Sequence, residues 1–429
     1  MLNRKTQRTF EQNAKDKKSD KKNKNDEKSY GKKVYTDKKS VEGKKRDGED
    51  ELCPVFTMCG GCEQLDAPYQ KQLKEKKKYL KELLKEYTSL EEMIGMENPF
   101  NYRNKVHATF DIDHGKIIAG TYKKNSHDVV SVDDCMIQNK KANEIICTIR
   151  DMCKGFRIKT YDEDTGYGLL RHVLIRHGYH TGEYMVVLVL GSPILPSKNN
   201  FVKALRTKHP EVSTVIVNVN NKKTSMILGD KETTIYGKGY IEDVLCGKRF
   251  RISPKSFYQI NPLQTEILYN KAIEYANLKG NEIVVDAYCG TGTIGMVAAD
   301  KAKEVIGVEL NSDAVRDARA NAKANNVRNI SFYNKDAGDF LIQMAEQNAK
   351  VDVVMMDPPR AGSDDAFLSA VLMLKPEKVV YISCNPETLV DDLEFLTAGG
   401  YRVDKAVGVD MFPHTRHVEC VVLMTKVEK

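Results

Sequence analysis

The chain has 429 residues, which is enough for two or three domains that each bury a core. Its net charge of +7 comes from residues 1–50, which hold 17 Lys and Arg against 10 Asp and Glu; residues 51–429 hold 50 of each. The balanced body excludes a uniformly basic fold, and apolar runs such as MVVLVL at 185–190 are too short to cross a bilayer.

Residues 1–50 have few apolar side chains and many Lys, Asp, Asn and Ser, so they cannot bury enough surface to order themselves. We expect a disordered Lys-rich tail that attracts RNA phosphates weakly, or one that only solvates the chain. The first residues lack the apolar stretch of a secretory signal. Ten Cys without the pattern of a small secreted domain fit a reducing compartment, so the sequence predicts a cytoplasmic protein.

Order is expected from about residue 52, where a cysteine-rich segment, 51–98, begins. Its three cysteines have the spacing C-x5-C-x2-C: Cys53, Cys59 and Cys62. Three later cysteines are candidates for a fourth ligand: Cys135, Cys147 and Cys153. This pattern predicts a metal site, and both zinc and an iron–sulfur cluster fit the spacing. The leucine spacing that follows predicts a helix over 66–87.

The region 99–252 is rich in short strand-like segments that Gly and Asn interrupt. Strands are expected at KVHATFDI, HVLIRHG, YMVVLVLG, STVIVNVN and TIYGKGYIEDVL, with helices at about 138–153 and 198–208.

From residue 253 onwards, strands and helices alternate. Helices are expected over 262–277, 294–302, 312–325, 337–348, 364–373 and 386–397. Strands are expected at EIVVDAY, VIGVEL, ISFYN, VDVVMMD, KVVYISC, YRVDKAVGVD and HVECVVLM. This alternation predicts an α/β fold with a doubly wound parallel sheet, and the last two strands are expected to form an antiparallel pair at its edge.

The segment VVDAYCGTGTIG is a strand, a glycine-rich turn and a helix start. Gly290, Gly292 and Gly295 match the pattern G-x-G-x-x-G, and Glu309 ends the next strand. The glycines let the backbone approach a ligand, and the carboxylate accepts ribose hydroxyls. By itself the motif fits either NAD or S-adenosylmethionine.

The sequence DPPR at 357–360 favours S-adenosylmethionine. Asp357 ends the fourth strand of this region, so it is expected at the same edge of the sheet as the glycine turn. The two prolines stiffen the loop that carries this carboxylate. Asp336, after the third strand, is a candidate adenine contact and equally a candidate helix N-cap.

Cys384, in YISCNP, and Glu419, in HVEC, together supply a thiol nucleophile and a carboxylate base. The C5 atom of uracil is not nucleophilic, but addition of a thiolate to C6 makes an enolate whose C5 can attack a sulfonium methyl. A base must then remove the surplus proton from C5 before the thiolate can leave. Cys384 and Glu419 are therefore the candidate catalytic pair, whereas Cys420 is expected in the core.

Several motifs occur here in one order: C-x5-C-x2-C, SFYQINP at 256–262, DAYCGTG, GVEL, DPPR, SCNP and HVEC. Together they resemble those of the RNA uracil-5-methyltransferase family, whose members make 5-methyluridine in ribosomal or transfer RNA. The resemblance covers about residues 51–429. It implies a class I Rossmann-like methyltransferase domain over 253–429, a β-rich central RNA-binding domain over 99–252 and an N-terminal iron–sulfur segment over 51–98.

The resemblance also implies roles for single residues. Cys384 is the nucleophile and Glu419 the proton acceptor. The S-adenosylmethionine site is lined by Gln259, Tyr288, Glu309 and Asp357, beside Gly290 and Gly292. The iron–sulfur branch of the family carries a [4Fe-4S] cluster, which implies four ligands here: Cys53, Cys59, Cys62 and, in SVDDCMI, Cys135.

The RNA target is left open between two classes. Many ribosomal members carry a small RNA-binding β-barrel before the cysteines, where this chain has its Lys-rich tail. The cysteines still favour 23S rRNA over tRNA, because the tRNA branch of enteric bacteria lacks the cluster. Candidate RNA contacts lie in NYRNKV and LLRHVLIR: Arg103, Lys105 and Arg171. We expect a monomer without an obligate protein partner. The rival interpretations are an NAD(P)-linked oxidoreductase and a non-catalytic RNA-binding protein.

Overall fold

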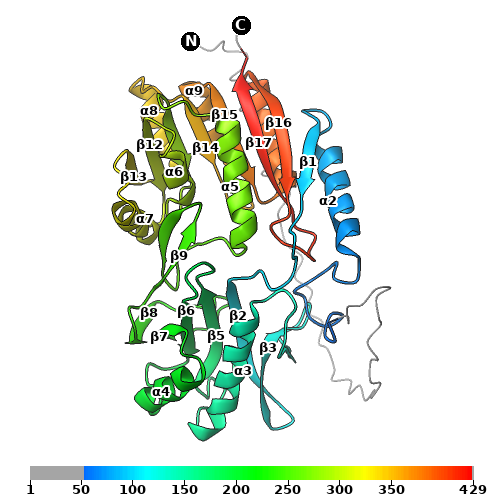
Figure 1. The fold of residues 1–429 in the computed structure, drawn as a ribbon, viewed down its shortest axis with the longest axis vertical. Coiled ribbons are helices and arrows are strands. Elements are labelled where there is room, and N and C mark those ends of the chain that lie inside the picture. The colour runs from blue at the N-terminus through cyan, green and yellow to red at the C-terminus, as the bar shows by residue number, and fades with distance from the viewer. Residues whose placement is uncertain (1–52, 428–429) are drawn as a thin grey trace, which may run out of the picture. The chain divides into compact units, whose positions relative to one another are not determined.

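The computed structural model describes residues 53–427 of the protein. The predicted disordered tail, residues 1–50, lies outside this range. In the part of the chain that is described, no helix is long and apolar enough to span a membrane. Two large sheets organise these residues, and helices cover them (Figure 1).

The first sheet belongs to the predicted β-rich region and has the strand order β4-β3-β2-β5-β6-β7-β8. Its strands are β2 (Lys105–Asp113), β3 (Lys116–Tyr122), β4 (Val129–Ser131), β5 (Leu170–His177), β6 (Tyr184–Leu190), β7 (Val212–Val219) and β8 (Lys231–Tyr236). Helices α3 (Lys140–Gly155) and α4 (Lys198–Lys208) pack their apolar residues into the core of this sheet. Only β6 and β7 pair in parallel, which the crossover through α4 permits.

The predicted strand TIYGKGYIEDVL is wrong as a single element. Gly237 and Gly239 have φ angles of 78° and 80°, a backbone that a strand cannot contain. The chain therefore ends β8 before these glycines and starts β9 (Ile241–Leu245) after them, where β9 pairs only with β10 (Lys248–Ile252).

The second sheet has eight strands in the order β1-β16-β17-β15-β14-β11-β12-β13. Its strands are β1 (Leu90–Ile94), β11 (Ile283–Ala287), β12 (Glu304–Glu309), β13 (Ile330–Asn334), β14 (Val353–Met356), β15 (Lys378–Ser383), β16 (Tyr401–Val409) and β17 (Glu419–Lys426). The helices are α2 (Tyr69–Leu84), α5 (Pro262–Ala276), α6 (Thr293–Ala298), α7 (Ser312–Ala324), α8 (Ala337–Glu346), α9 (Asp365–Leu374) and α10 (Pro386–Ala398).

This sheet is doubly wound, as the alternation of strands and helices predicts. Along β11, Val284 belongs to the same core cluster as residues of α5, α6 and α7, whereas Val285 belongs to the cluster that contains residues of α2, α8, α9 and α10. Side chains of a strand point alternately to its two faces, so each face of the sheet has its own core and its own layer of helices. The chain reverses direction across the sheet between β11 and β14, and ligands bind at the carboxyl edge of such a switch point.

The predicted antiparallel pair, β16 and β17, is present, but the prediction that it forms the sheet edge is wrong. β17 lies between β15 and β16, and β1 pairs in parallel with the outer side of β16. β1 has the polar sequence LEEMI and gains its strand conformation from this pairing. A part of the predicted segment 51–98 is thus a strand of the second sheet, and the four-part division of the chain stays a prediction.

Candidate functional site

The glycine-rich turn after β11 has a backbone that glycine favours. Tyr288, Gly290 and Gly292 have φ angles of 62°, 55° and 80°. A Cβ atom added to Gly292 would lie 2.7 Å from Phe332 Cζ, whereas one added to Gly290 would meet nothing within 4 Å. Gly292 is therefore required for close packing, and the space beside Gly290 is open to a ligand.

Glu309, at the end of β12, is hydrogen-bonded to this turn. Its Oε2 accepts a hydrogen bond from Gly290 N at 3.1 Å, and its Oε1 accepts one from Asn311 N at 2.7 Å. Because β11 and β12 are parallel neighbours, their carboxyl ends bring the turn and the carboxylate together.

Asp286, the residue before the end of β11, is a candidate that the sequence did not single out. It is 1% exposed, and its Oδ2 accepts a hydrogen bond from Gly295 N at 2.7 Å. Its Oδ1 is buried and has no hydrogen-bond partner among the described residues. Burial raises the pKa of this carboxyl to about 7, with a further contribution from the negative charges of Asp357 and Glu309.

Asp357 lies directly after β14, the strand beside β11, as the DPPR motif predicts. Its backbone N–H donates a hydrogen bond to Ala287 O at 3.5 Å, which joins the DPPR loop to the glycine turn. Burial raises the pKa of this carboxyl also to about 7. Asp286 and Asp357, two carboxyls with raised pKa values, thus lie at the same edge of the sheet.

Cys384 follows β15, and its neighbours fix the turn that carries it. Ser383 Oγ donates to Asn385 O at 2.9 Å, and Asn385 caps α10 by accepting from Glu387 N. Asn385 Nδ2 also donates to Arg360 O at 3.0 Å, which joins the SCNP turn to the DPPR loop. Burial raises the pKa of the Cys384 thiol to about 11, and the carboxylates of Glu419 and Asp357 add to the shift.

Glu419 is the first residue of β17 and is 2% exposed. Among the described residues, no hydrogen bond or salt bridge reaches its carboxylate. Burial, followed by the charge of Asp357, raises the pKa of this carboxyl well above its usual range, and Arg360 opposes the shift. The predicted nucleophile and base therefore lie within electrostatic reach of each other and of Asp357.

Two further side chains belong to this group: Tyr269, which lies outside the sequence motifs, and Arg360, the last residue of DPPR, which was not singled out as a site residue. Tyr269, on α5, is buried, and its hydroxyl is 3.0 Å from Thr293 Oγ1. Burial and the charges of Asp357 and Glu419 raise its pKa well above the usual range, so its ring lies near both carboxyls. The exposed Arg360 is the cation that lowers the pKa of both Cys384 and Glu419.

The remaining predicted cofactor residues are Gln259, Tyr288 and Asp336, and each makes a different kind of contact within the fold. Gln259 is 8% exposed, and its backbone carbonyl accepts a hydrogen bond from Asn104 Nδ2 at 3.0 Å. The Tyr288 ring packs against Phe367, with 5.1 Å between ring centroids. Asp336 is the N-cap of α8 and accepts a hydrogen bond from Asp339 N at 3.1 Å. The structure thus shows the second of the two roles predicted for it, the helix cap.

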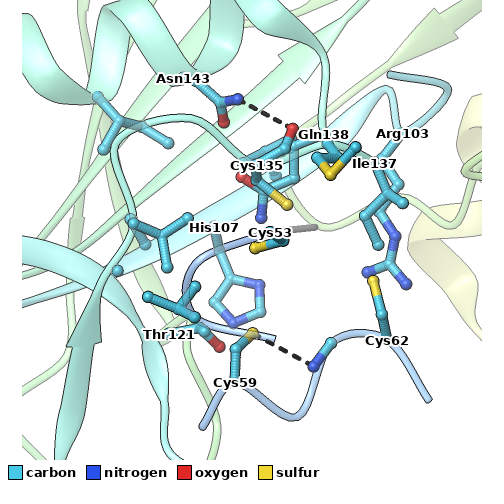
Figure 2. Close-up of a pocket in the computed structure, with 18 of the residues that line it drawn as sticks. Cys53, Cys59, Cys62, Arg103, His107, Thr121, Cys135, Ile137, Gln138 and Asn143 are labelled. Carbon is cyan, nitrogen blue, oxygen red and sulfur yellow. Dashed lines mark hydrogen bonds between the residues drawn. The ribbon is translucent and has the colours of Figure 1, made fainter. Parts of the chain in front are cut away.

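The four predicted metal ligands lie around one cavity of about 100 Å³, although Cys135 is far from the others in sequence (Figure 2). Cys53, Cys59 and Cys62 come from the amino-terminal loop, and Cys135 comes from the loop before α3. Cys147 and Cys153, the other candidates for a fourth ligand, do not line this cavity. Of the three candidates for a fourth ligand, Cys135 is thus the one that lines the same cavity as the three amino-terminal cysteines.

The thiols in this cavity are held apart rather than converged on one point. Within residues 53–427, no group of three or more His, Cys, Asp or Glu is arranged to hold a single metal ion. Gly61 N donates to Cys59 Sγ at 3.3 Å, and burial raises the pKa of Cys62 to about 12.

The three predicted RNA contacts have different environments. Arg103 and Lys105 line the cysteine cavity, and Arg103 Nε is buried without a hydrogen-bond partner among the described residues. Lys105 is exposed at the start of β2, but partial desolvation of its ammonium group lowers its pKa to about 8, and the charge of Arg176 adds to the shift. Arg171 is 2% exposed and donates to Glu163, Asn220 O and Lys222 O. An RNA contact of Arg171 requires the 220–222 loop to move.

The sheet order and the site at its carboxyl edge define a Rossmann-like methyltransferase domain. Counted from β11, the strands lie in the order 3-2-1-4-5-7-6, with the seventh antiparallel to its neighbours. The glycine turn, the second-strand carboxylate and the acidic fourth-strand loop meet at the switch point.

Comparison with known proteins identifies the family. Residues 68–427 match the family model described as tRNA (Uracil-5-)-methyltransferase. The chain is 42% identical over 386 residues to an uncharacterized RNA methyltransferase of Bacillus cereus, covering 89% of this chain and 84% of that protein. A second uncharacterized RNA methyltransferase, from Clostridium tetani, is 41% identical and is covered over 82% of its length, with 87% of this chain aligned.

A solved structure agrees with these matches. The Pyrococcus abyssi tRNA (uracil-54, C5)-methyltransferase, in complex with S-adenosyl-L-homocysteine, is 30% identical, with a TM-score of 0.72 and 86% of each chain covered. The chain therefore belongs to the tRNA (uracil-5-)-methyltransferase family and is an RNA (uracil-5-)-methyltransferase with an S-adenosylmethionine-dependent fold. This membership confirms the resemblance seen in the motifs and excludes the NAD(P)-linked oxidoreductase and the non-catalytic RNA-binding protein.

Proposed function

We propose that this enzyme methylates C5 of one uridine in RNA through a covalent bond between Cys384 Sγ and C6 of the base. The observation that carries the proposal is that Glu419 and Asp357 lie close enough to Cys384 to raise the pKa of its thiol, and Asp357 close enough to Glu419 to raise the pKa of its carboxyl. This arrangement supports a site in which Cys384 is the nucleophile, Glu419 is the base and Asp357 is a carboxylate that attracts cations.

The proposed reaction has three steps. The Cys384 thiolate adds to C6, and the electrons of the C5–C6 double bond move to form an enolate. C5 then takes the methyl group from the sulfonium of S-adenosylmethionine, whose sulfur leaves as a neutral thioether. Glu419 removes the proton from C5, the double bond re-forms, and the bond between C6 and sulfur breaks. The uridine must be unpaired or flipped out, because C5 and C6 are not reachable within a stack.

The ionisation of the site supports a cationic methyl donor. The raised pKa values of Asp286, Asp357 and Glu419 all have burial as their main cause. A positive charge placed near these groups stabilises their ionised forms and lowers their pKa values. We infer that the sulfonium of S-adenosylmethionine lies near Asp357. Its positive charge there would stabilise the ionised forms of these carboxyls and lower their pKa values.

Binding of S-adenosylmethionine is therefore expected to release protons. Asp286 and Asp357 have pKa values of about 7 in the free protein, so below that pH they are largely protonated. Affinity should rise with pH towards 7, by about tenfold per pH unit for each proton released, and level off above it. S-adenosylhomocysteine, whose sulfur is neutral, is the matched control and should show a weaker dependence. Calorimetry of both ligands in buffers of different ionisation enthalpy measures the released protons; equal release would contradict this placement of the sulfonium.

We propose 23S rRNA as the substrate, with tRNA as the second candidate. The four cysteines around one cavity support the first, since the tRNA branch of enteric bacteria lacks them. Similarity to the Pyrococcus abyssi tRNA (uracil-54, C5)-methyltransferase favours the second. Mapping 5-methyluridine in both RNAs from a deletion strain separates the candidates. We expect one 23S rRNA site to disappear and to return with the wild-type gene; loss confined to tRNA would overturn the first assignment.

The cysteine cavity is proposed to hold a [4Fe-4S] cluster, which supplies a structural bridge between the two loops when bound. Four thiolates around a cavity, rather than around one point, are the donor set that such a cluster needs. The raised pKa values of Cys59, Cys62 and Cys135, mainly due to burial, mean that thiolate formation here depends on a bound cation.

Metal analysis tests this cluster directly. Protein purified without oxygen should be brown and contain about four iron and four sulfide per chain. Cys135→Ser should lose the colour, whereas Cys147→Ser, the matched control outside the cavity, should keep it. Stoichiometric zinc without sulfide would contradict the cluster but not the methyltransferase activity.

A further inference from the structure

The loop that joins β16 to β17 ends at Glu419 and is held almost entirely by distant parts of the chain. Asp410 N donates to Ile94 O, Asn261 Nδ2 donates to Met411 O, and Tyr102 OH donates to Pro413 O. We call residues 410–418 the base loop, because they lead into the predicted base. Each residue of the base loop from 410 to 416 takes part in a backbone or side-chain hydrogen bond.

The base loop contains a residue in an unfavourable backbone conformation. His414 has a φ angle of 67° and is fully buried. Its ring stacks on Phe100, with 4.7 Å between ring centroids. A non-glycine residue keeps such a conformation only where its surroundings impose it, and such residues concentrate at active sites. The contacts to His414 therefore fix the course of the chain five residues before Glu419.

These contacts come from the segment that directly follows the cysteine loop. Glu63 N and Gln64 N both donate to His414 O at 3.1 Å. Gln72 Oε1 accepts from His414 N at 3.0 Å, and Gln72 Nε2 donates to Gln64 O and Ala67 O. Gln72 is fully buried, so it has no water to replace these partners.

Two more contacts anchor the two ends of the base loop to the same segment. Near its start, Lys76 Nζ lies 2.7 Å from Asp410 Oδ1 and donates to Phe412 O at 3.2 Å. Near its end, Glu63 Oε2 accepts from Arg416 N at 3.2 Å. Glu63 is bonded directly to Cys62, so a single peptide unit separates the cysteine cavity from the base loop.

We propose that Glu63 and Gln72 are positioning residues that hold Glu419 where it can take the proton from C5. They act through the base loop and touch neither the thiol of Cys384 nor the turn after β11. The inference rests on the proposed role of Glu419 as the base. Its specific consequence is that disturbing this segment slows proton removal and product release, but not addition of the thiol or transfer of the methyl group.

Two RNA substrates separate these steps. On ordinary RNA, product release requires loss of the C5 proton. On RNA that contains 5-fluorouridine, fluorine occupies the place of that hydrogen and cannot leave as a proton. Adduct formation on the fluorinated RNA thus reports addition and methyl transfer alone, whereas release from ordinary RNA reports the base. In vitro transcribed 23S rRNA, with transcribed tRNA beside it, serves as the probe in both forms.

The variants remove different numbers of contacts between this segment and the base loop, so their effects on product release should differ in size. Gln72→Met removes all polar contacts of Gln72 at similar volume and should slow release by about tenfold to a hundredfold. Glu63→Ala removes the acceptor for Arg416 N together with a negative charge near Lys76, and it should slow release less. Glu63→Gln keeps an acceptor oxygen without the charge and should restore release. Lys74→Met changes an exposed residue of the same helix and is the matched control. All variants should form the fluorinated adduct at the wild-type rate.

Each result then has one interpretation. Slow release with unchanged fluorinated adduct supports the positioning role. Equal slowing on both RNAs would show that the segment supports the whole site and would overturn it, as would release at the wild-type rate in all variants. If Gln72→Met does not fold, the comparison of Glu63→Ala with Glu63→Gln still decides whether the segment positions Glu419. Failure of the wild-type protein to form any adduct would instead overturn the proposed function itself.

Discussion

Cys384→Ala is expected to abolish methyl transfer, with a loss of at least about four orders of magnitude in single-turnover rate. In the proposed mechanism the thiol converts the uracil into an enolate, so its removal leaves C5 without the activation that methyl transfer needs. No covalent complex with RNA should form on a denaturing gel, and no 5-methyluridine should appear in the digested RNA. Binding of S-adenosylmethionine should persist, because the variant leaves the turn after β11 and the DPPR loop intact.

Cys420→Ala is the matched control for this experiment. Cys420 is adjacent to Glu419, but it is fully buried in the core on the opposite face of β17. Its loss should cost stability on the order of 1 kcal/mol and leave the chemical step unchanged. Formation of 5-methyluridine by Cys384→Ala would show that the covalent mechanism is wrong.

Glu419→Gln is expected to trap the reaction after methyl transfer. Addition and transfer do not need the base, but the thiolate cannot leave until C5 loses its proton. Release should slow by at least about a hundredfold, and a methylated complex of protein and RNA should accumulate on denaturing gels. Donor labelled in its methyl group identifies this complex, because the label then migrates with the protein. Turnover at the wild-type rate without a trapped complex would mean that another group is the base.

Thermal unfolding distinguishes this effect from damage to the fold. The folded-state pKa of Glu419 is raised, so at pH values above the unfolded pKa the folded protein must either keep the proton or bury the charge. Both cost stability, and the cost grows as pH rises from the unfolded pKa towards the folded pKa. Glutamine removes this cost. The variant should therefore unfold at neutral pH at the same temperature as the wild type or a higher one.

The local pattern was sufficient to predict most elements of the second sheet. The helices after β12, β13, β14 and β15 have nearly the predicted bounds. The residue that caps each of these helices directly precedes it in the sequence, so a local pattern contains it. Asn385 caps α10 and Asn311 caps α7 in this way. Elements that depend on distant partners were not predictable. β1 has two glutamates in five residues and becomes a strand only through the free edge of β16.

Single residues also divide into those whose surroundings the local sequence predicts and those whose surroundings depend on distant parts of the chain. Arg171 lies on a strand whose every residue is buried. Its guanidinium is satisfied by the carboxylate of Glu163, eight residues earlier, and by the backbone carbonyls of Asn220 and Lys222 in a distant loop. The alternation of polar and apolar residues cannot reveal this, because helices and loops cover both faces of that sheet. Asp286 was visible in the motif VVDAYCGTG, yet its unpartnered oxygen is a property of the folded surroundings alone.

The family of this protein could be inferred from its local motifs. A thiol, a carboxylate, a glycine turn and an acidic loop appear in an order that identified the RNA uracil-5-methyltransferase family, since each motif is local and its residue types are fixed by what they must do. Which residues meet depended on the folded chain: it placed Cys135 rather than Cys147 beside the cysteine loop and joined Gln72 to His414, 342 residues away. Such contacts follow from how the sheet closes and how α2 packs, and no local pattern records them.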